Sequence, residues 1–506
     1  MTLSIEERLH ALSPERLAGM RRGVEKESLR TLADGTLALT PHPLALGSAL
    51  THPCITTDFS ESQLELITAP HASAQACEAE LREIHGFVVR AIGAERMWAS
   101  SMPCDLPTDE TIPLGRYGTS NVGRAKSVYR MGLGHRYGRR MQTISGIHYN
   151  WSLPGLGNDE YFALIRNFRR HSFLLLVLFG ASPAVCASFV QGRNHALQPL
   201  GADTYALPHA TSLRMGRLGY QSDAQAALNV SYNCLEGYAA SLHGALTTPH
   251  PPYEAIGVRN LGGEYNQLAT SLLQIENEFY GTIRPKRTIR SGERPLHALR
   301  ERGVEYVEVR CMDLDPFEEV GIRAQTMHFL DVFLLHCLLA DSPPDTPQET
   351  VALARNQHLT ASSGRTPGLR LERAEHSLTL VEWGREVLEG CAPIAARLDA
   401  LQATDAHAQA LALAHARLAD LATTPSARVL AEIETAHQGS FRAFGVAQSA
   451  WAREALLAQE PPAGVTQRLQ RAAQESLAEQ RQREAADTLA FEDFREQYLS
   501  PQRLLA

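Results

Sequence analysis

The sequence lacks any apolar stretch long enough to cross a bilayer, which takes about 20 helical residues. Its most apolar run covers only residues 173–179, between Arg170 and Gly180. The first residues, MTLSIEERLHALSPERL, also lack the basic start and apolar middle of a signal peptide. We therefore expect a cytoplasmic protein without membrane contacts, in which residues 173–179 form a buried helix or strand.

An excess of positive charge is missing as well. The 506 residues include 48 Lys and Arg against 56 Asp and Glu, for a formal net charge of -8. A general nucleic-acid binder carries a basic surface, so we expect no nucleic-acid partner. The charge does not exclude an anionic substrate, because a bound metal ion can make a site locally positive.

Closely spaced cysteine pairs are also absent. The eight cysteines are dispersed without a CxxC pair, which excludes a zinc knuckle and a thioredoxin-like motif. In a cytoplasmic chain of this size we expect buried, reduced thiols, with a redox-sensitive pair left open. The positions are Cys54, Cys77, Cys104, Cys186, Cys234, Cys311, Cys337 and Cys391.

A true phosphate-binding P-loop is missing, although residues 118–125, GTSNVGRA, have its glycine spacing. Arg124 stands where the lysine belongs, and Ala125 replaces the metal-binding serine or threonine. No clear buried strand precedes the segment, because Pro113 and Gly115 interrupt it. If the protein binds ATP, we expect carboxylate-held metal ions to hold the phosphates.

The composition of the chain changes near residue 341, where residues 341–345, DSPPD, form a turn-rich break. We expect residues 1–340 to form a catalytic α+β region, with a strong strand at Val304–Met312. Residues 341–506 show helical periodicity and are expected to pack on the first region, as a second domain or as part of the same one.

Two segments of the second region carry more specific expectations. Residues 356–371 contain Ser-Ser-Gly and Pro-Gly and predict a loop that interrupts the helices. Residues 467–486 are almost all charged or small, which predicts a solvated surface helix without a catalytic role.

Several short segments predict strands with charged groups on one face. Side chains two residues apart in a strand share a face, which pairs Glu25 with Glu27 and Glu308 with Arg310. Glu65 stands alone between two leucines. Taken singly, each segment is more typical of an exposed strand face or an ordinary ion pair.

Residues 147–153, IHYNWSL, show the cleanest alternation. The odd positions are apolar, whereas His148, Asn150 and Ser152 share the opposite face. That pattern suits a sheet with a core behind it and a site in front. A single histidine in such a strand is still more often a structural residue.

The polar faces become informative if these strands belong to one sheet, which periodicity alone does not prove. The shared face would then combine carboxylates with one imidazole, a set that suits Mg²⁺ or, alternatively, Mn²⁺. Its members would be Glu25, Glu27, Asp58, Glu65, His148, Glu308 and Arg310. Basic groups that could meet phosphates or carboxylates are Arg130, Arg214, Arg284 and Lys286.

Together the motifs resemble the proteobacterial type of glutamate–cysteine ligase. They cover most of residues 20–340 in the expected order, whereas the segment after Pro154 is short for that family. The matching stretches are GVEKESLR (23–30), LGSALTHPCITTDFSESQLELIT (46–68), ERMWASSMPC (95–104), RYGTSNVGRAKSVYRMGL (116–133), RYGRRMQTISGIHYNWSLP (136–154), LFGASPAVCASF (178–189), ATSLRMGRLGY (210–220), LQIENEFYGTIRPKR (273–287) and GVEYVEVRCMDLDPF (303–317).

The resemblance implies a glutamine-synthetase-like α+β fold, in which a curved, mainly antiparallel sheet forms a funnel-shaped active site with helices outside. It implies that the metal ions are held by Glu25, Glu27, Asp58, Glu65, His148 and Glu308. Arg310, with Glu308, would act at the transferred phosphoryl group. The nucleotide phosphates would lie near Arg130, Arg284 and Lys286.

The resemblance also implies the binding sites for the two amino acids. Glutamate would be recognised by Arg214, Asn150 and Gln142. The cysteine pocket would be walled by Phe59, Tyr129, Tyr220 and Tyr280, and Ile144 would be a further substrate-binding residue.

The expected reaction is the ATP-dependent joining of the γ-carboxylate of L-glutamate to the amine of L-cysteine through a γ-glutamyl phosphate. This is the first step of glutathione synthesis, and we expect a monomer under feedback inhibition by glutathione. The alternatives are a ligase of the same fold that acts on another amine, a guanidino kinase, and a non-catalytic nucleotide or metal sensor.

Overall fold

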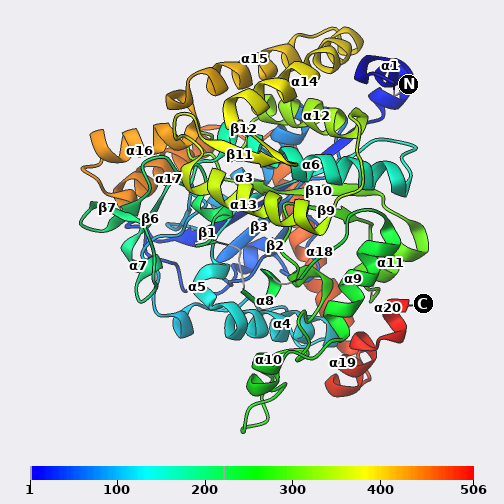
Figure 1. Ribbon diagram of the computed structural model, residues 1–506. Helices are drawn as coiled ribbons and strands as arrows, with labels where there is room; N and C mark the ends of the chain where they lie inside the picture. Colours follow the sequence, from blue (N-terminus) through cyan, green and yellow to red (C-terminus); the bar gives the residue numbers. More distant parts are fainter. Residues whose placement is uncertain (1–2, 220–222, 227, 291, 506) are drawn as a thin grey trace.

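The computed structural model describes residues 3–219, 223–226, 228–290 and 292–505, and it has an α+β fold around one antiparallel sheet (Figure 1). The spatial order of the strands is β2-β3-β1-β5-β10-β9, with β4 paired to β1. The predicted α+β class and antiparallel sheet are confirmed. The strands of this sheet are β1 (Arg21–Thr31), β2 (Ile55–Thr57), β3 (Gln63–Ile67), β4 (Arg96–Met97), β5 (Ile147–Ser152), β9 (Ile283–Lys286) and β10 (Tyr306–Met312).

Two small sheets lie outside the main one. The first contains β6 (Ala184–Cys186), β7 (Gln198–Gly201) and β8 (Thr204–Ala206), and the second is the hairpin of β11 (Arg370–Arg373) and β12 (His376–Thr379). The strong strand expected at Val304–Met312 is confirmed as β10.

Helices surround the main sheet, with α12, α14 and α15 above the strands and α4 below them in Figure 1. Those of the first region are α1 (Ile5–His10), α2 (Pro14–Ala18), α3 (Ala74–Ala91), α4 (Asn121–Tyr137), α5 (Arg139–Gln142), α6 (Asn158–Phe179), α7 (Ala187–Val190), α8 (Asp223–Ala226), α9 (Leu235–Thr247), α10 (Pro251–Ile256), α11 (Pro295–Arg302) and α12 (Ala324–Leu339). After residue 341 follow α13 (Pro347–Ser363), α14 (Leu380–Gln402), α15 (Ala406–Ala419), α16 (Pro425–Thr435), α17 (Phe441–Ala458), α18 (Val465–Ala486), α19 (Phe491–Leu499) and α20 (Gln502–Leu505).

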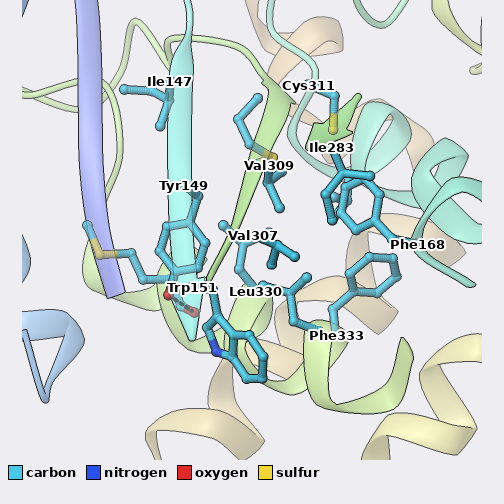
Figure 2. Close-up of a cluster of buried hydrophobic side chains, with 14 of the residues drawn as sticks. Ile147, Tyr149, Trp151, Phe168, Ile283, Val307, Val309, Cys311, Leu330 and Phe333 are labelled. Atoms are coloured by element: carbon cyan, nitrogen blue, oxygen red, sulfur yellow. Dashed lines mark hydrogen bonds between the residues drawn. The ribbon is translucent and has the colours of Figure 1, made fainter. Parts of the chain in front are cut away.

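The apolar face of the sheet forms the centre of the core. Figure 2 shows Tyr149 and Trp151 of β5 and Val307 of β10 lying close to Leu330 and Phe333 of α12. Helix α6 covers the same face, and its last turns hold the run at 173–179, which is buried in a helix. Because strand side chains alternate, burying this face turns the polar side chains of β5 and β10 to the opposite face.

Buried residues from both halves of the chain share this core. The largest apolar cluster runs from Leu9 in α1 to Leu469 in α18, and it includes Trp383 of α14 and Leu418 of α15. Within the part of the chain that the structure describes, no helix combines the length and hydrophobicity needed to span a membrane.

Two expectations about the second region are confirmed only in part, since residues 364–369 do form a loop and most of the helix over 467–486 is exposed. Residues 356–363 continue helix α13 instead of forming a loop, because Thr360 and Ala361 pack fully buried against the first region. Helix α18 is not a freely solvated surface helix: Val465, Leu469, Ala473 and Ser476 are buried along one side. Their spacing gives a narrow buried stripe on a helix that is otherwise polar.

The expectation of reduced thiols is wrong for one pair. Cys104 and Cys186 form a disulfide across 82 residues of sequence. Both lie in a second buried cluster around the small sheet of β6–β8, which brings them together. The other six cysteines are free, and four of these are buried.

A buried ion pair joins the sheet to α12. The Arg22 guanidinium of β1 lies 3.0 Å from the Asp331 carboxylate, and both side chains are almost fully buried. The Tyr149 hydroxyl donates a second bond to Asp331, at 2.7 Å. Asp331 is the only acid in the mostly apolar α12, so this buried carboxylate depends on these two partners.

We predict that Asp331→Ala lowers the free energy of unfolding by about 3–5 kcal/mol, because it leaves the Arg22 charge buried without its partner. Urea unfolding followed by far-UV circular dichroism measures the change. Asp341→Ala is the matched control, since Asp341 pairs with Arg8 at the surface and should cost no more than about 1 kcal/mol. Equal losses in the two variants would contradict the prediction.

Candidate active site

Antiparallel pairing brings the predicted metal ligands onto one face of the sheet. In the register of the strands, Glu25 of β1 stands opposite His148 of β5, and Glu27 stands opposite Glu65 of β3. On the other side of β5, Asn150 stands opposite Glu308 of β10. The strand adjacency that periodicity alone could not establish is therefore present.

His148 lies at the centre of these carboxylates. Its Nδ1 atom is 3.1 Å from Glu25 and 3.9 Å from Glu308, and its Nε2 atom is 3.4 Å from Glu27. Glu25, Glu65 and His148 offer ligand atoms that all lie within 4.8 Å of one another. We call the six residues predicted to hold metal the acid cage: Glu25, Glu27, Asp58, Glu65, His148 and Glu308.

Burial, with repulsion from neighbouring carboxylates, raises the pKa of two of these acids. Burial is the largest cause of the raised pKa of Glu65, and the charges of Glu25, Asp58 and Glu27 add to it. Burial also raises the pKa of Glu27, and Asp58 contributes again. Asp58 follows directly after β2, and from there its charge raises the pKa of both Glu27 and Glu65. A cation among these oxygens would relieve the repulsion.

Glu308 is surrounded by positive charge instead. Its carboxylate lies 3.0 Å from Lys286 of β9 and 3.0 Å from Arg310. Burial disfavours its charged form, but Lys286, Arg310 and His148 outweigh that effect and hold the pKa of Glu308 well below its usual range. The site thus has an acidic side at Glu65 and a basic side at β9 and β10.

The side chains predicted to bind glutamate lie near the acidic and basic sides of the site. Asn150 donates to Glu25 at 2.9 Å, and Gln142 donates to the Tyr280 hydroxyl at 2.8 Å. Arg214 donates to the Arg310 carbonyl at 2.9 Å. The loop before β5 passes so close that a Cβ atom at Gly146 would fall 2.1 Å from the Arg214 guanidinium, so a larger residue there would have to displace this guanidinium.

A cavity of about 230 Å³ opens beside these residues. Arg214, Tyr280 and Arg310 are among the side chains that line it, together with Gln225 and with Gln357 of α13. A cavity of this size, lined by three arginines and two tyrosines, suits a small anionic molecule such as an amino acid.

Other predicted pocket residues take different positions. Phe59 and Ile144 are buried, at 1% and 0% exposure, and lie outside the described lining of this cavity. Tyr129 lies on α4 and is partly buried. Tyr220 falls outside the residues that the structure describes.

The three predicted nucleotide-binding residues occupy two sides of the site. Arg284 and Lys286 belong to β9, where Arg284 stands opposite Glu308. Arg130 belongs to α4 on the other side, and its guanidinium donates to the carbonyl oxygens of Asp58 and Thr57. It thereby braces the segment that carries Asp58.

Sequence reasoning missed Lys126, which lies one turn before Arg130 on α4. Its ammonium is 5.1 Å from the centre of the Tyr117 ring. Burial lowers the pKa of Lys126 to about 8, as does Arg130, whereas Glu65 raises it. Composition could have revealed it: only Lys26, Lys126 and Lys286 are lysines among the 48 basic residues.

Lys26 lies behind the site. It stands on β1 between the two cage acids, but it points to the core side, where its Nζ atom is 3.2 Å from Nδ1 of His85. Burial lowers its pKa to about 7. All three lysines are therefore at or directly behind the acid cage.

Comparison with known proteins gives a consistent result. A family model described as glutamate-cysteine ligase matches residues 8–156 and 154–360, and the two stretches meet near Pro154, after which we expected a short segment. The glutamate–cysteine ligase of Saccharophagus degradans is 47% identical over 502 residues, covering 95% of this chain and 94% of the relative. That of Janthinobacterium sp. is 49% identical over 505 residues, with 96% and 95% covered.

A solved structure agrees with the sequence relatives. The crystal structure of glutamate–cysteine ligase from Francisella tularensis in complex with AMP superposes with a TM-score of 0.90 at 35% identity. The match covers 96% of this chain and 98% of that one. The chain belongs to the glutamate–cysteine ligase family.

Proposed function

We propose that the protein joins the γ-carboxylate of L-glutamate to the amine of L-cysteine at the expense of ATP. The products are γ-glutamylcysteine, ADP and phosphate, and the reaction is the first step of glutathione biosynthesis. Family membership supports both amino acids, and the AMP bound by the Francisella relative supports the nucleotide. The observation that carries the proposal is the acid cage with Arg310 and Lys286 at its edge.

We assign the acid cage to Mg²⁺, with Mn²⁺ as the alternative. Carboxylate oxygens with a single imidazole are the donors that these hard cations accept. The raised pKa of Glu65 supports the assignment, because these buried acids repel one another without a counter-charge. When bound, the metal would neutralise phosphate charge and would orient the reacting carboxylate oxygen.

The reaction needs an activated carboxyl group, because a free carboxylate has no good leaving group. A γ-carboxylate oxygen of glutamate attacks the terminal phosphorus of ATP and ADP leaves, which gives γ-glutamyl phosphate. The neutral amine of cysteine then attacks the acyl carbon, loses a proton and expels phosphate. Phosphoryl transfer depends mainly on positioning and charge neutralisation, which Arg310 is placed to supply.

The two amino acids are assigned to the two sides of the 230 Å³ cavity region. Arg214, Asn150 and Gln142 recognise glutamate, because a guanidinium and two amides suit its carboxylates and amine. Tyr280 and Tyr129 belong to the cysteine pocket, with Phe59 and Ile144 buried in its wall. Arg284 and Lys286 form the basic side, which binds the nucleotide phosphates. Arg130 binds the same phosphates from α4.

The proposal extends to the setting in which the enzyme works. We propose a cytoplasmic monomer that glutathione inhibits. Glutathione contains the γ-glutamyl and cysteinyl groups of the product, so a site built for both amino acids would accept it.

We predict that purified protein with Mg-ATP and glutamate releases ADP when cysteine is added, with a product of the mass of γ-glutamylcysteine. The control is a panel of other amines. Discrimination against 2-aminobutyrate should be modest, within about 200-fold in kcat/KM, because a methyl group replaces one thiol. ADP release with another amine only would favour a different ligase, and no ADP release would favour a sensor.

We predict that Glu308→Gln and Arg310→Ala each lower kcat by about 10²–10³-fold, since each removes an electrostatic contact at the transferred group. Circular dichroism should show that both variants are folded. Glu305→Gln is the matched control, because Glu305 is exposed and pairs with Arg287 outside the site. Near-normal turnover in either site variant would remove that residue from the mechanism.

We predict opposite effects of Glu65→Gln on the metal-free and metal-bound protein. Because the folded-state pKa of Glu65 is raised, the metal-free fold loses stability as pH rises through that pKa. The glutamine removes this cost, so the metal-free variant should melt at a higher temperature than wild type at pH 8. Its gain in melting temperature on adding Mg²⁺ should shrink, and an undiminished gain would contradict the metal assignment of Glu65.

A further inference from the structure

The end of the chain forms a strap that crosses the site-bearing side of the molecule. We define the C-terminal strap as residues 465–505, which comprise α18, α19 and α20. In Figure 1 this segment runs from behind the sheet to the right of α4 and ends beside α11. Although it is remote in sequence, the strap contacts the segments before β2 and at the start of α4.

The first half of the strap is seated on the segment that leads to β2 and Asp58. The Ser48 amide donates to the Ser476 hydroxyl at 2.9 Å, and the Thr51 hydroxyl donates to the Ser476 carbonyl at 2.6 Å. A Cβ atom at Gly47 would fall 2.7 Å from Cα of Ala473, so the two backbones approach as closely as glycine allows. The strap is thus packed there, not loosely attached.

The middle of the strap satisfies the first amides of α4. Glu484 accepts from the Thr119 amide at 2.8 Å, and Asp487 accepts from the Asn121 amide. The Asn121 side chain in turn donates to the Leu489 carbonyl at 3.1 Å. Two carboxylates from the strap therefore lie at the start of this helix, where unpaired amides and the helix dipole favour negative charge.

The next turn of the strap builds a small core behind α4. Phe491 is 4% exposed and forms one buried cluster with Ala125 and Leu268, against which the partly buried Tyr129 also packs. The Arg124 guanidinium lies 4.4 Å from the centre of the Phe491 ring. The strap thus supports α4 next to Tyr129, which is assigned to the cysteine pocket.

Helix α4 has a small apolar face and is held mostly by polar contacts, such as those of Arg136 with Glu278 and Gln267. Its buried residues are Asn121, Gly123, Ala125, Gly132 and Leu133, which include only one large apolar side chain. A helix is normally fixed in a fold by its apolar face. Because that face is almost missing, the position of α4 depends on its polar contacts and on the strap.

We propose that Asp487 and Phe491 are positioning residues of the reaction, which hold α4 so that Tyr129 and Arg130 face the cysteine pocket and the Asp58 segment. This inference rests on the proposed function, since it uses the assignment of Tyr129 to cysteine. It gives the C-terminal strap a role in substrate binding. Neither residue touches a substrate; both act through α4.

The test measures KM for cysteine, glutamate and Mg-ATP in Phe491→Ala and Asp487→Ala. Phe491→Ala should raise KM for cysteine about tenfold or more, because small displacements of binding groups are costly. KM for Mg-ATP should rise clearly less than KM for cysteine, since Arg284 and Lys286 lie on β9 and only Arg130 of the three phosphate-binding residues lies on α4. Asp487→Asn keeps an oxygen acceptor for the Asn121 amide and should restore most of the cysteine affinity.

Phe441→Ala is the matched control for lost packing. Phe441 begins α17, is 1% exposed and packs beside Trp98 and Phe444, in a cluster that meets α4 through the partly buried Tyr137 at the other end of that helix from the strap. It should lower the melting temperature as much as Phe491→Ala does, without changing KM for cysteine. An equal rise in that KM in the control, or no rise in Phe491→Ala, would overturn the inference.

Two further outcomes stay informative. If Phe491→Ala does not fold, the comparison of Asp487→Ala with Asp487→Asn decides the question alone, since these change only the contact at Asn121. Equal KM values for cysteine in that pair would overturn the inference. A wild-type protein that makes no γ-glutamylcysteine would refute the proposed function itself, whereas an active wild type with unaltered variants would refute only the role of the strap.

Discussion

Buried carboxylates that repel one another are the constraint on which the rest of this structure depends. Glu25, Glu27 and Glu65 project from neighbouring strands toward His148, and burial makes their shared charge costly. Among the described residues, no arginine forms an ion pair with these three acids, so the space between them is free for the proposed cation. The basic groups lie one strand away, at Glu308. This separation agrees with the proposed assignment of one half of the site to a metal and the other to phosphate.

The core maintains this arrangement from behind. Tyr149 and Trp151 pack against α6 and α12, so a slip of β5 by one residue would turn them to the polar face and turn His148 into the apolar core. The Arg22–Asp331 pair fixes β1 to the same helix. Packing on the apolar face of the sheet thus stabilises the close, mutually repelling carboxylates on its polar face. Such local conflicts are expected at functional sites.

Alternation along single strands could predict which residues share a face, and it identified Glu25, Glu27, His148, Glu308 and Arg310 correctly as neighbours on one polar surface. It could not establish that these strands lie in one sheet, which the family resemblance implied, and the strand order came only from the structure. The Ser-Ser-Gly segment misled because turn-forming residues also occur at helix ends, where α13 places them. The disulfide of Cys104 and the contacts of Asp487 join positions far apart in sequence, and no local pattern encodes such pairs.

The scarcity of lysine has a practical consequence for chemical work on this enzyme. Arginine serves nearly every exposed cationic position, so the ε-amines are confined to Lys26, Lys126 and Lys286. Lys26 is sealed in the core, whereas the other two are partly exposed at the rim of the reaction centre. Acylating reagents aimed at lysine would therefore modify the working centre first, and tethering the protein to a resin through these amines would obstruct it. Because so few ε-amines exist, the rate at which they are acylated would report whether substrates occupy the site.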